Sequence, residues 1–488
     1  MQSQQSDIGQ GANFAVQAIE AIGYGRFQVL ICLLSTSAAY FTESFLVSSW
    51  KSAALEYFGL STIEDLGRGV ALLELADDWT YYVGMICGFL ADSMGRRWVL
   101  VRSLGVAMVA SWVFSLTLGY RSMLVANIFW QVASGAMFTS GIALASECAP
   151  DDYKMVNRGI GIDTLNLSGM IIGIFGAIGT PLFLLPLTDS PGLLASPTSP
   201  GLAALPAAVS NTILFPLLYL YLPESPVYLA SVGRQKEAGE ALHFIEKLSI
   251  GSEGYAGAML PETTGSQERG TAWSVYERLR VVFLTQYCRT FWFLFVFFLL
   301  VKSDDNELFP SGPPTFVARL GVWEIATIAA IRFVGEVFSV ANATMFSRSV
   351  ALGNAMVLYF APPLVWILAD FFRPGNFVAE AIAQIATVFY LLKNRVVLTI
   401  GYQLAVESFP TPAAVTAGAF IIQGNHLHKY WGELETYLFG SYAMPVHELM
   451  VIVITVLSYS GLPLQSSKNA KPMPNEIYGT FQQEQKSV

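Results

Sequence analysis

Long apolar runs recur along the whole chain, separated by short polar breaks. Segments such as 29–49, 97–118 and 159–186 reach the ~20 residues that a helix needs to cross a bilayer core. Hydrophobic residues make up 53% of the chain and charged residues 13%, whereas charged residues are about a quarter of an ordinary soluble protein. One soluble core cannot bury so many consecutive apolar runs. The sequence therefore predicts an all-α membrane protein.

Run length predicts roughly twelve transmembrane helices in two six-helix bundles. The expected spans lie near 29–49, 72–91, 97–118, 122–146, 159–186, 205–222, 284–301, 316–346, 350–371, 377–405, 412–440 and 444–462. The predicted organisation is a cytoplasmic N-terminal segment (1–28), a first bundle (29–222), a cytoplasmic linker (223–281), a second bundle (282–464) and a cytoplasmic tail (465–488). Segment 412–440 contains NHLHKYWGELE, which leaves a helix, an interrupted helix or a loop open.

The distribution of Lys and Arg orients the spans. The loops expected inside carry more of these residues than the opposing loops, as in the positive-inside pattern, so both termini are predicted to be cytoplasmic. We expect a multi-pass integral protein of the plasma membrane or an intracellular vesicle membrane, surrounded by lipid and monomeric. No basic stripe suggests nucleic acid, and the four cysteines are irregularly spaced. We expect no cofactor and no metal.

The stretch GMICGFLADSMGRRWVL, residues 84–100, places an acid, a glycine and two arginines between two apolar segments. We expect a short cytoplasmic turn over 88–97, with Gly95 reversing the chain and Arg96 and Arg97 in the aqueous interface. Asp92 ends a helix, where the helix dipole disfavours negative charge. It therefore needs an arginine or the N-terminus of a neighbouring helix as a partner. Such a pair could hold the cytoplasmic side shut; the alternative is a plain positive-inside turn.

This spacing resembles the loop signature of the major facilitator superfamily. Four further stretches resemble the sugar porters and the organic ion transporters related to synaptic vesicle protein two: LPESPVYLASVGRQKEAGEAL from Leu222, SECAPDDYKMVNRG, ESFPT and EAIGYGRFQ. The resemblance covers about residues 14 to 465. It implies two rocking bundles with a gate at the cytoplasmic loops. The residues carried over to that gate are Gly88, Asp92, Gly95, Arg96, Arg97, Glu147, Arg158, Glu224, Arg234 and Glu407.

Several positions depart from the pattern of the superfamily. Ser93 stands where an arginine usually follows the aspartate, and Thr344 stands near the aspartate expected in the second half. The fourth helix lacks its usual arginine, and Gln131 is the polar residue it keeps. These departures count against a complete gating cycle and against transport itself.

Ionisable residues at bilayer depth are candidates for solute or proton binding. Glu43 could carry a proton, or be an interfacial carboxylate; Asp163 could carry a proton or form an ion pair. Arg332 and Glu336 share one helix face and could be a self-neutralising pair. Arg395 and Lys429 could each bind an organic anion. The alternatives are that Arg395 snorkels toward the lipid head groups and that Lys429 lies in a loop. With Gln131, these residues form the predicted solute or proton set.

The sequence contains no catalytic constellation, so we do not expect an enzyme. The resemblance implies a secondary transporter that moves a small solute, an organic ion first, by a proton gradient or by facilitated diffusion. A transporter-shaped receptor or regulatory protein that no longer transports is the alternative function. A sugar is the alternative substrate, suggested by the PESP stretch at 223–226.

Overall fold

The fold is described from a computed structural model. The structure describes residues 14–22, 82–116, 119–148, 200–250, 273–285, 287–301, 345–372, 408–440 and 443–460, with single positions and short pieces between 334 and 406. Within these residues the secondary structure is helical.

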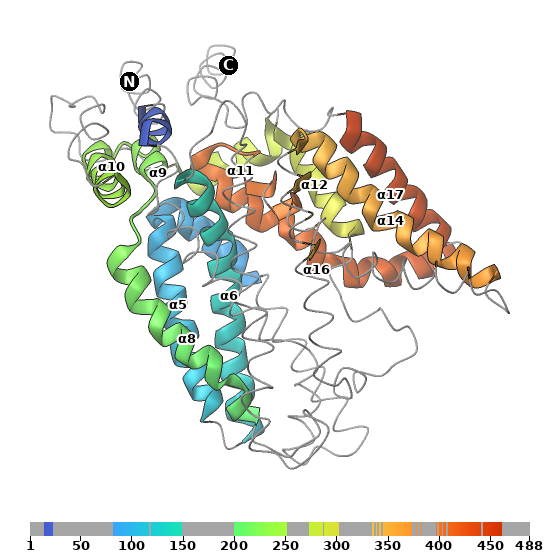
Figure 1. The fold of residues 1–488 in the computed structure, drawn as a ribbon, viewed down its shortest axis with the longest axis horizontal. Helices are drawn as coiled ribbons and strands as arrows, with labels where there is room; N and C mark the ends of the chain where they lie inside the picture. Colours follow the sequence, from blue (N-terminus) through green and yellow to red (C-terminus); the bar gives the residue numbers. More distant parts are fainter. Residues whose placement is uncertain are drawn as a thin grey trace.

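The N-terminal helices are the helix Tyr82–Met94, α5 (Arg96–Ser115), α6 (Tyr120–Cys148) and α8 (Pro200–Tyr221). In Figure 1, α5 stands between α6 and α8 and packs against both. Gly105 lies under the Phe215 ring, and Trp112 Nε1 donates a 2.8 Å hydrogen bond to Thr212 Oγ1. Small side chains and a cross-helix hydrogen bond thus hold α5 against α8, as is common between membrane helices.

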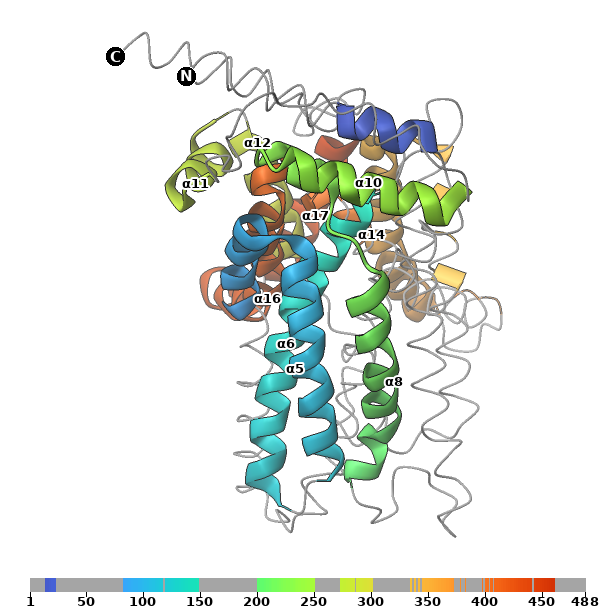
Figure 2. The same cartoon turned by 90° about the vertical axis from the view of Figure 1, so that its left-hand side faces the viewer.

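Short helices cover one end of this group, called here the α10 end. They are helix 14–22, α9 (Pro226–Ser231) and α10 (Gln235–Ile250), and they lie across the top of α5 and α8 in Figure 2. Ser225 Oγ caps α9 by accepting from the Tyr228 N–H at 3.0 Å, with proline at the first helical turn. Ile19, Leu242 and other buried apolar residues join these helices to the ends of α5 and α8.

The C-terminal helices are α11 (Val275–Leu284), α12 (Tyr287–Leu300), α14 (Arg348–Phe372), the 3-10 turn η5 (Thr411–Ala413), α16 (Ala414–Phe439) and α17 (Ala443–Ser460). α12 packs against α16 and α14 against α17. Gly424 permits the first contact, because a Cβ there would collide with the Phe295 carbonyl oxygen. Rings of α11, α12 and α16 fill the space between these helices: Phe283 meets both Phe291 and Phe420 edge to face.

The expected spans 97–118, 122–146, 205–222, 284–301, 350–371 and 444–462 coincide with helices to within a few residues. Segment 412–440 is one α-helix from Ala414 to Phe439, which rules out the loop among its three alternatives. Within the described residues, α5 and α6 are each long and apolar enough to cross a bilayer, and two bent helix pairs raise the number to as many as four. The total of twelve remains a prediction.

Candidate gating site

A single residue makes the turn between the helix Tyr82–Met94 and α5. Gly95 has φ 116° and ψ 151°, a region essentially restricted to glycine. Its N–H donates to the Ala91 carbonyl at 3.1 Å, and a Cβ there would lie 2.9 Å from Glu224 Cδ. The predicted extent of the turn, 88–97, is wrong: Gly88 to Met94 stay helical, because no residue before Gly95 interrupts the backbone hydrogen bonds.

Arg96 is fully buried among charged and aromatic partners. Its Nη2 lies 3.0 Å from Asp92 Oδ1 and 3.2 Å from Glu147 Oε1, and its Nη1 donates to the Ala91 carbonyl at 3.2 Å. The guanidinium also covers the Tyr228 ring, 4.0 Å from the centroid. The expectation that Arg96 stays in the aqueous interface is therefore wrong. Two carboxylates compensate its charge, so burial does not leave it unpaired.

The same two residues cross to the C-terminal helices. Arg96 Nη2 donates to the carbonyl oxygen of Thr411 in η5. Asp92 Oδ2 accepts a 2.8 Å hydrogen bond from the N–H of Thr416, in the first turn of α16. A carboxylate at a helix N-terminus satisfies a free N–H and meets the positive end of the dipole. Asp92 thus has both of the partners that the sequence left as alternatives.

Arg278 of α11 makes a second bridge, which sequence reasoning missed. This buried side chain donates to the carbonyls of Phe89 (3.0 Å) and Asp92 (3.0 Å) and to Ser93 Oγ (2.7 Å). It therefore covers the C-terminal carbonyls of the helix Tyr82–Met94, where positive charge is stabilising. Ser93, the departure from the superfamily pattern, accepts one of these hydrogen bonds. The only signal in the sequence is an arginine placed just before an apolar run.

Glu224 holds the beginning of α5. Its Oε1 accepts from the backbone N–H of Arg96 (3.0 Å), Arg97 (3.1 Å) and Ser225 (3.0 Å). Burial raises the pKa of Glu224, and the N–H groups of Arg97 and Ser225 oppose that rise. The Arg97 side chain points elsewhere, donating to the Tyr219 carbonyl at 2.7 Å. Glu224 thus fixes the backbone on which the Arg96 network stands.

Two other predicted gate residues have different surroundings. Gly88 faces α16 closely: a Cβ there would lie 2.9 Å from the Ala419 Cβ and 3.1 Å from the Val415 carbonyl oxygen. Arg234 forms an exposed ion pair with Glu237, whose hydrogen bond raises the pKa of Arg234. Gly88 therefore lies at the contact between the two helix groups, whereas Arg234 lies apart from the Arg96 network.

The structure places the remaining predicted residues as follows. Gln131 is buried in α6, and Lys429 belongs to the continuous helix α16. Outside the described residues lie Arg158, Glu407, Glu43, Asp163, Arg332, Glu336 and Arg395. The described part of the chain thus brings together Asp92, Arg96, Glu147 and Glu224, with Gly88 beside them.

Comparison with solved structures assigns the fold. The E. coli proton:xylose symporter XylE, a major facilitator superfamily protein, is similar with a TM-score of 0.65 at 15% identity, over 92% of this chain and 97% of that chain. The human organic anion transporter MFSD10 is similar with a TM-score of 0.56 at 12% identity, over 90% and 99% of the two chains. The fold is that of the major facilitator superfamily.

The family follows from the sequence itself. Residues 82–420 match the family model described as "Sugar (and other) transporter", and the chain belongs to this family. This match confirms the resemblance to the sugar porter-like and organic ion transporters. It also confirms the predictions that the chain is a multi-pass integral membrane protein and that it is not an enzyme.

Curated relatives match over a shorter stretch. Organic cation/carnitine transporter 2 of Rattus norvegicus is 25% identical over 174 residues, which is 33% of this chain and 28% of the relative. The protein of the same name from Mus musculus matches to the same extent. The matched stretch thus spans under a third of the length of these relatives.

Proposed function

We propose that this protein is a secondary transporter that moves a small solute across a membrane by alternating access. The observation that carries the proposal is the buried Arg96 network. Its charged groups come from the helix Tyr82–Met94, α5 and α6, and its partners in the C-terminal helices are backbone groups of η5 and α16. It therefore joins the N-terminal and C-terminal helices at the α10 end, where a transporter must open and close.

The network suits a contact that breaks and re-forms. Burying Asp92, Arg96 and Glu147 costs desolvation energy of several kcal/mol per ion, and their mutual attraction offsets much of it. When the two groups of helices separate at this end, water reaches the ions and returns their hydration. The attraction between the buried ions favours the closed state, and their hydration favours the open state. Because these two energies oppose each other, a bound solute can shift the equilibrium between the states.

The finer features of the proposal follow the sequence. The α10 end is cytoplasmic, the chain has about twelve spans in two bundles joined by the 223–281 linker, and the protein acts as a monomer in the plasma membrane or a vesicle membrane. The solute is an organic ion, which the 25% identity to organic cation/carnitine transporter 2 supports. A sugar is the second substrate class, supported by the fold of the xylose symporter. Protons are the proposed coupling ion.

A non-transporting receptor or regulatory protein is the second candidate function. The observation that favours it is a neutral chain of hydrogen bonds in the C-terminal helices. Asn354 Nδ2 donates to Asn342 Oδ1 at 2.9 Å, and Tyr459 Oη donates to Asn354 Oδ1 at 2.7 Å. These residues lie near the second-half loop that has lost its aspartate. A neutral chain at this place gives up less hydration energy on closing than the Arg96 network does.

Uptake by cells that express the chain separates the two functions. The panel contains organic cations, organic anions, nicotinate-like acids and hexoses, with internalised compounds measured by mass spectrometry. We expect at least one organic ion to accumulate with wild type and about tenfold less with Asp92→Asn, because the amide leaves Arg96 short of one buried counter-charge. Glu240→Gln, at an exposed α10 position, is the control and retains uptake.

Surface labelling confirms that each variant reaches the membrane. Accumulation of a hexose alone would replace the organic ion by a sugar. No accumulation of any compound by surface-expressed wild type would favour the receptor. Equal uptake by wild type and Asp92→Asn would remove the gating role of the network.

A further inference from the structure

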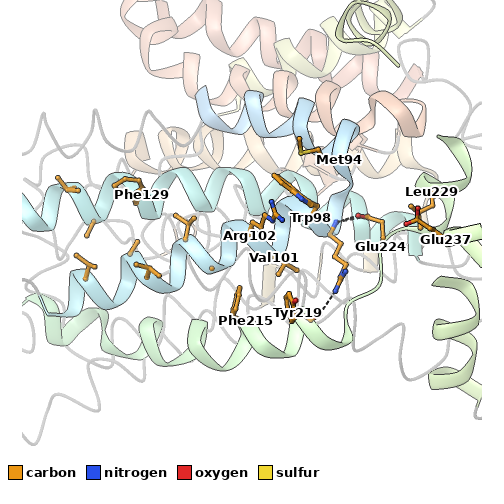
Figure 3. Close-up of a pocket in the computed structure, with 18 of the residues that line it drawn as sticks. Met94, Trp98, Val101, Arg102, Phe129, Phe215, Tyr219, Glu224, Leu229 and Glu237 are labelled. Carbon is orange, nitrogen blue, oxygen red and sulfur yellow. Dashed lines mark hydrogen bonds between the residues drawn. The ribbon is translucent and has the colours of Figure 1, made fainter. Parts of the chain in front are cut away.

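A groove of about 920 Å³ runs along the N-terminal helices. Figure 3 shows side chains of α5, α6 and α8 around it, with Glu224 and Glu237 at the α10 end. All of its lining residues lie between Met94 and Glu237, so the described C-terminal helices do not line it. A solute path between two bundles takes its lining from both. This groove is therefore separate from the proposed transport path.

The long wall of the groove is apolar and exposed. Val109 of α5 is 58% exposed and Phe129 of α6 is 54% exposed, and Phe215 of α8 also lines the groove. In a protein that crosses a bilayer, exposed apolar side chains in the middle of spanning helices face hydrocarbon. This part of the groove therefore has the chemistry of an acyl-chain contact.

The α10 end of the groove is charged. Arg97, Arg102 and Arg234 line it together with Glu224 and Glu237, so positive side chains outnumber negative ones. Arg234 is paired with Glu237, and Glu224 is held by backbone N–H groups. The compensation of the arginines is thus incomplete at the end of the groove that leads to the membrane surface.

Arg102 carries a charge that no described carboxylate compensates. Its guanidinium lies 4.0 Å from the centroid of the Trp98 ring, one turn nearer the α10 end, and the described residues give it no carboxylate partner. Arg102 is exposed and follows the first residue of α5 by six positions, about 9 Å along the helix. Its long side chain thus reaches back along α5 toward the α10 end, as a snorkelling arginine does. Arg97 lines the same end of the groove, and its Nη2 donates to the Tyr219 carbonyl rather than to a carboxylate.

We propose that this groove is a binding site for an anionic phospholipid of the leaflet at the α10 end. The phosphate lies between Arg102 and Arg97. The exposed Arg102 guanidinium supplies hydrogen-bond donors, and both side chains supply positive charge. One acyl chain follows Val109 and Phe129 along α5 and α6. Basic pockets between membrane helices favour acidic head groups in this way, and each Arg near the surface contributes about a fivefold preference.

The structure favours a lipid over a soluble organic anion. A soluble anion would have to lie beside exposed valines in the hydrocarbon region, whereas a lipid already places its phosphate at the surface and its chains at this depth. The assignment concerns the outer wall of the N-terminal helices, so it holds whether or not the solute proposed above is an organic ion.

Native mass spectrometry of the purified full chain tests the proposal. The protein is incubated with equimolar dioleoylphosphatidylglycerol and dioleoylphosphatidylcholine, and the ratio of retained lipids is measured. We expect wild type to retain more phosphatidylglycerol. Arg102→Gln should lower this ratio about fivefold. Val109→Trp, which fills the apolar wall while keeping every charge, should reduce retention of phosphatidylglycerol as well.

Arg121→Gln is the matched control, since Arg121 is an exposed arginine at the other end of α6 that does not line the groove. It should keep the wild-type ratio. Equal retention of the two lipids by wild type would overturn the proposal, and so would an equal loss in Arg102→Gln and Arg121→Gln. Retention of a soluble organic anion that phosphatidylglycerol does not displace would overturn the choice of a lipid.

Discussion

The Asp92 carboxylate and the Thr416 backbone N–H, 324 residues apart in the sequence, are joined by a 2.8 Å hydrogen bond. This bond attaches the C-terminal end of one helix to the N-terminal end of α16. The C-terminal end of a helix carries a partial negative charge and the N-terminal end a partial positive charge. The Asp92 carboxylate, paired with Arg96, adds to the attraction between these two ends. The contact between the two groups of helices at the α10 end thus depends on electrostatic partners that a single substitution can remove.

Arg278→Gln should destabilise the contact from the C-terminal side. The change removes charge-assisted hydrogen bonds to the Phe89 and Asp92 carbonyls, each worth about 1.5–3 kcal/mol. We expect the apparent Tm of the purified protein, followed by intrinsic fluorescence, to fall by several degrees. Arg289→Gln, at an exposed α12 position, is the control. The same Tm for both variants would argue against a stabilising role for Arg278.

Gly88→Ala should push α16 away from the helix Tyr82–Met94. The added Cβ would lie 2.9 Å from the Ala419 Cβ, closer than such atoms pack, so a helix must move at a cost of about 1–3 kcal/mol. Reduced uptake with normal surface expression is the expected result. Gly84→Ala provides the comparison, because the atom nearest to its Cβ would be the Gly135 carbonyl oxygen, at an ordinary contact distance of 3.6 Å. Similar uptake by the two variants would show that this close approach is not needed.

Gly95→Ala should impair folding more than gating. Alanine strains the backbone at φ 116° by about 1–3 kcal/mol, and its Cβ would displace the Glu224 carboxylate from the start of α5. The yield of monodisperse protein and its Tm should both fall. Gly119→Ala, where a Cβ meets nothing within 4 Å, should leave both unchanged. A Gly95→Ala protein as stable as wild type would contradict the turn described here.

The raised pKa of Glu224 predicts a definite sign of pH dependence. A carboxyl group with a raised pKa binds its proton more tightly in the folded protein than in the unfolded chain. Its contribution to stability therefore falls as pH rises from the ordinary value of 4.5 toward the raised one. Tm measured against pH for wild type and Glu224→Gln should show wild type losing stability relative to the variant over this range. A constant difference would show that Glu224 does not titrate in the folded protein.

The helices were predictable because membrane spans are set by run length. α5, α6 and α12 match their expected segments, since ~20 consecutive apolar residues leave few alternatives in a bilayer. The polar run NHLHKYWGELE was harder, because its composition fits a loop as well as a helix. The structure continues α16 through this run.

The gate was only partly predictable. The need of Asp92 for a partner follows from its position at a helix end, and the resemblance to the superfamily pointed to Arg96 and Glu147. The burial of Arg96 could not be inferred, because it depends on the Glu147 carboxylate, 51 residues away, and the Thr411 carbonyl, 315 residues away. Arg278 was missed because its partners include backbone carbonyls, which no residue type in the sequence identifies.

Accessibility of Cys87 tests the central claim most directly. Cys87 is half-buried on the helix Tyr82–Met94 and packs with Ala91, Ala414 and Val415, where the two groups of helices meet. In a single-cysteine protein, its labelling by N-ethylmaleimide reports how often this contact opens. That protein carries replacements of the other cysteines, Cys32, Cys148 and Cys288.

The account predicts that Asp92→Asn labels about tenfold faster than the single-cysteine parent, because a broken buried ion network favours the open state. Glu240→Gln should label at the parental rate. Equal labelling rates for Asp92→Asn and the parent would contradict the claim that the Asp92–Arg96 network closes this end of the protein.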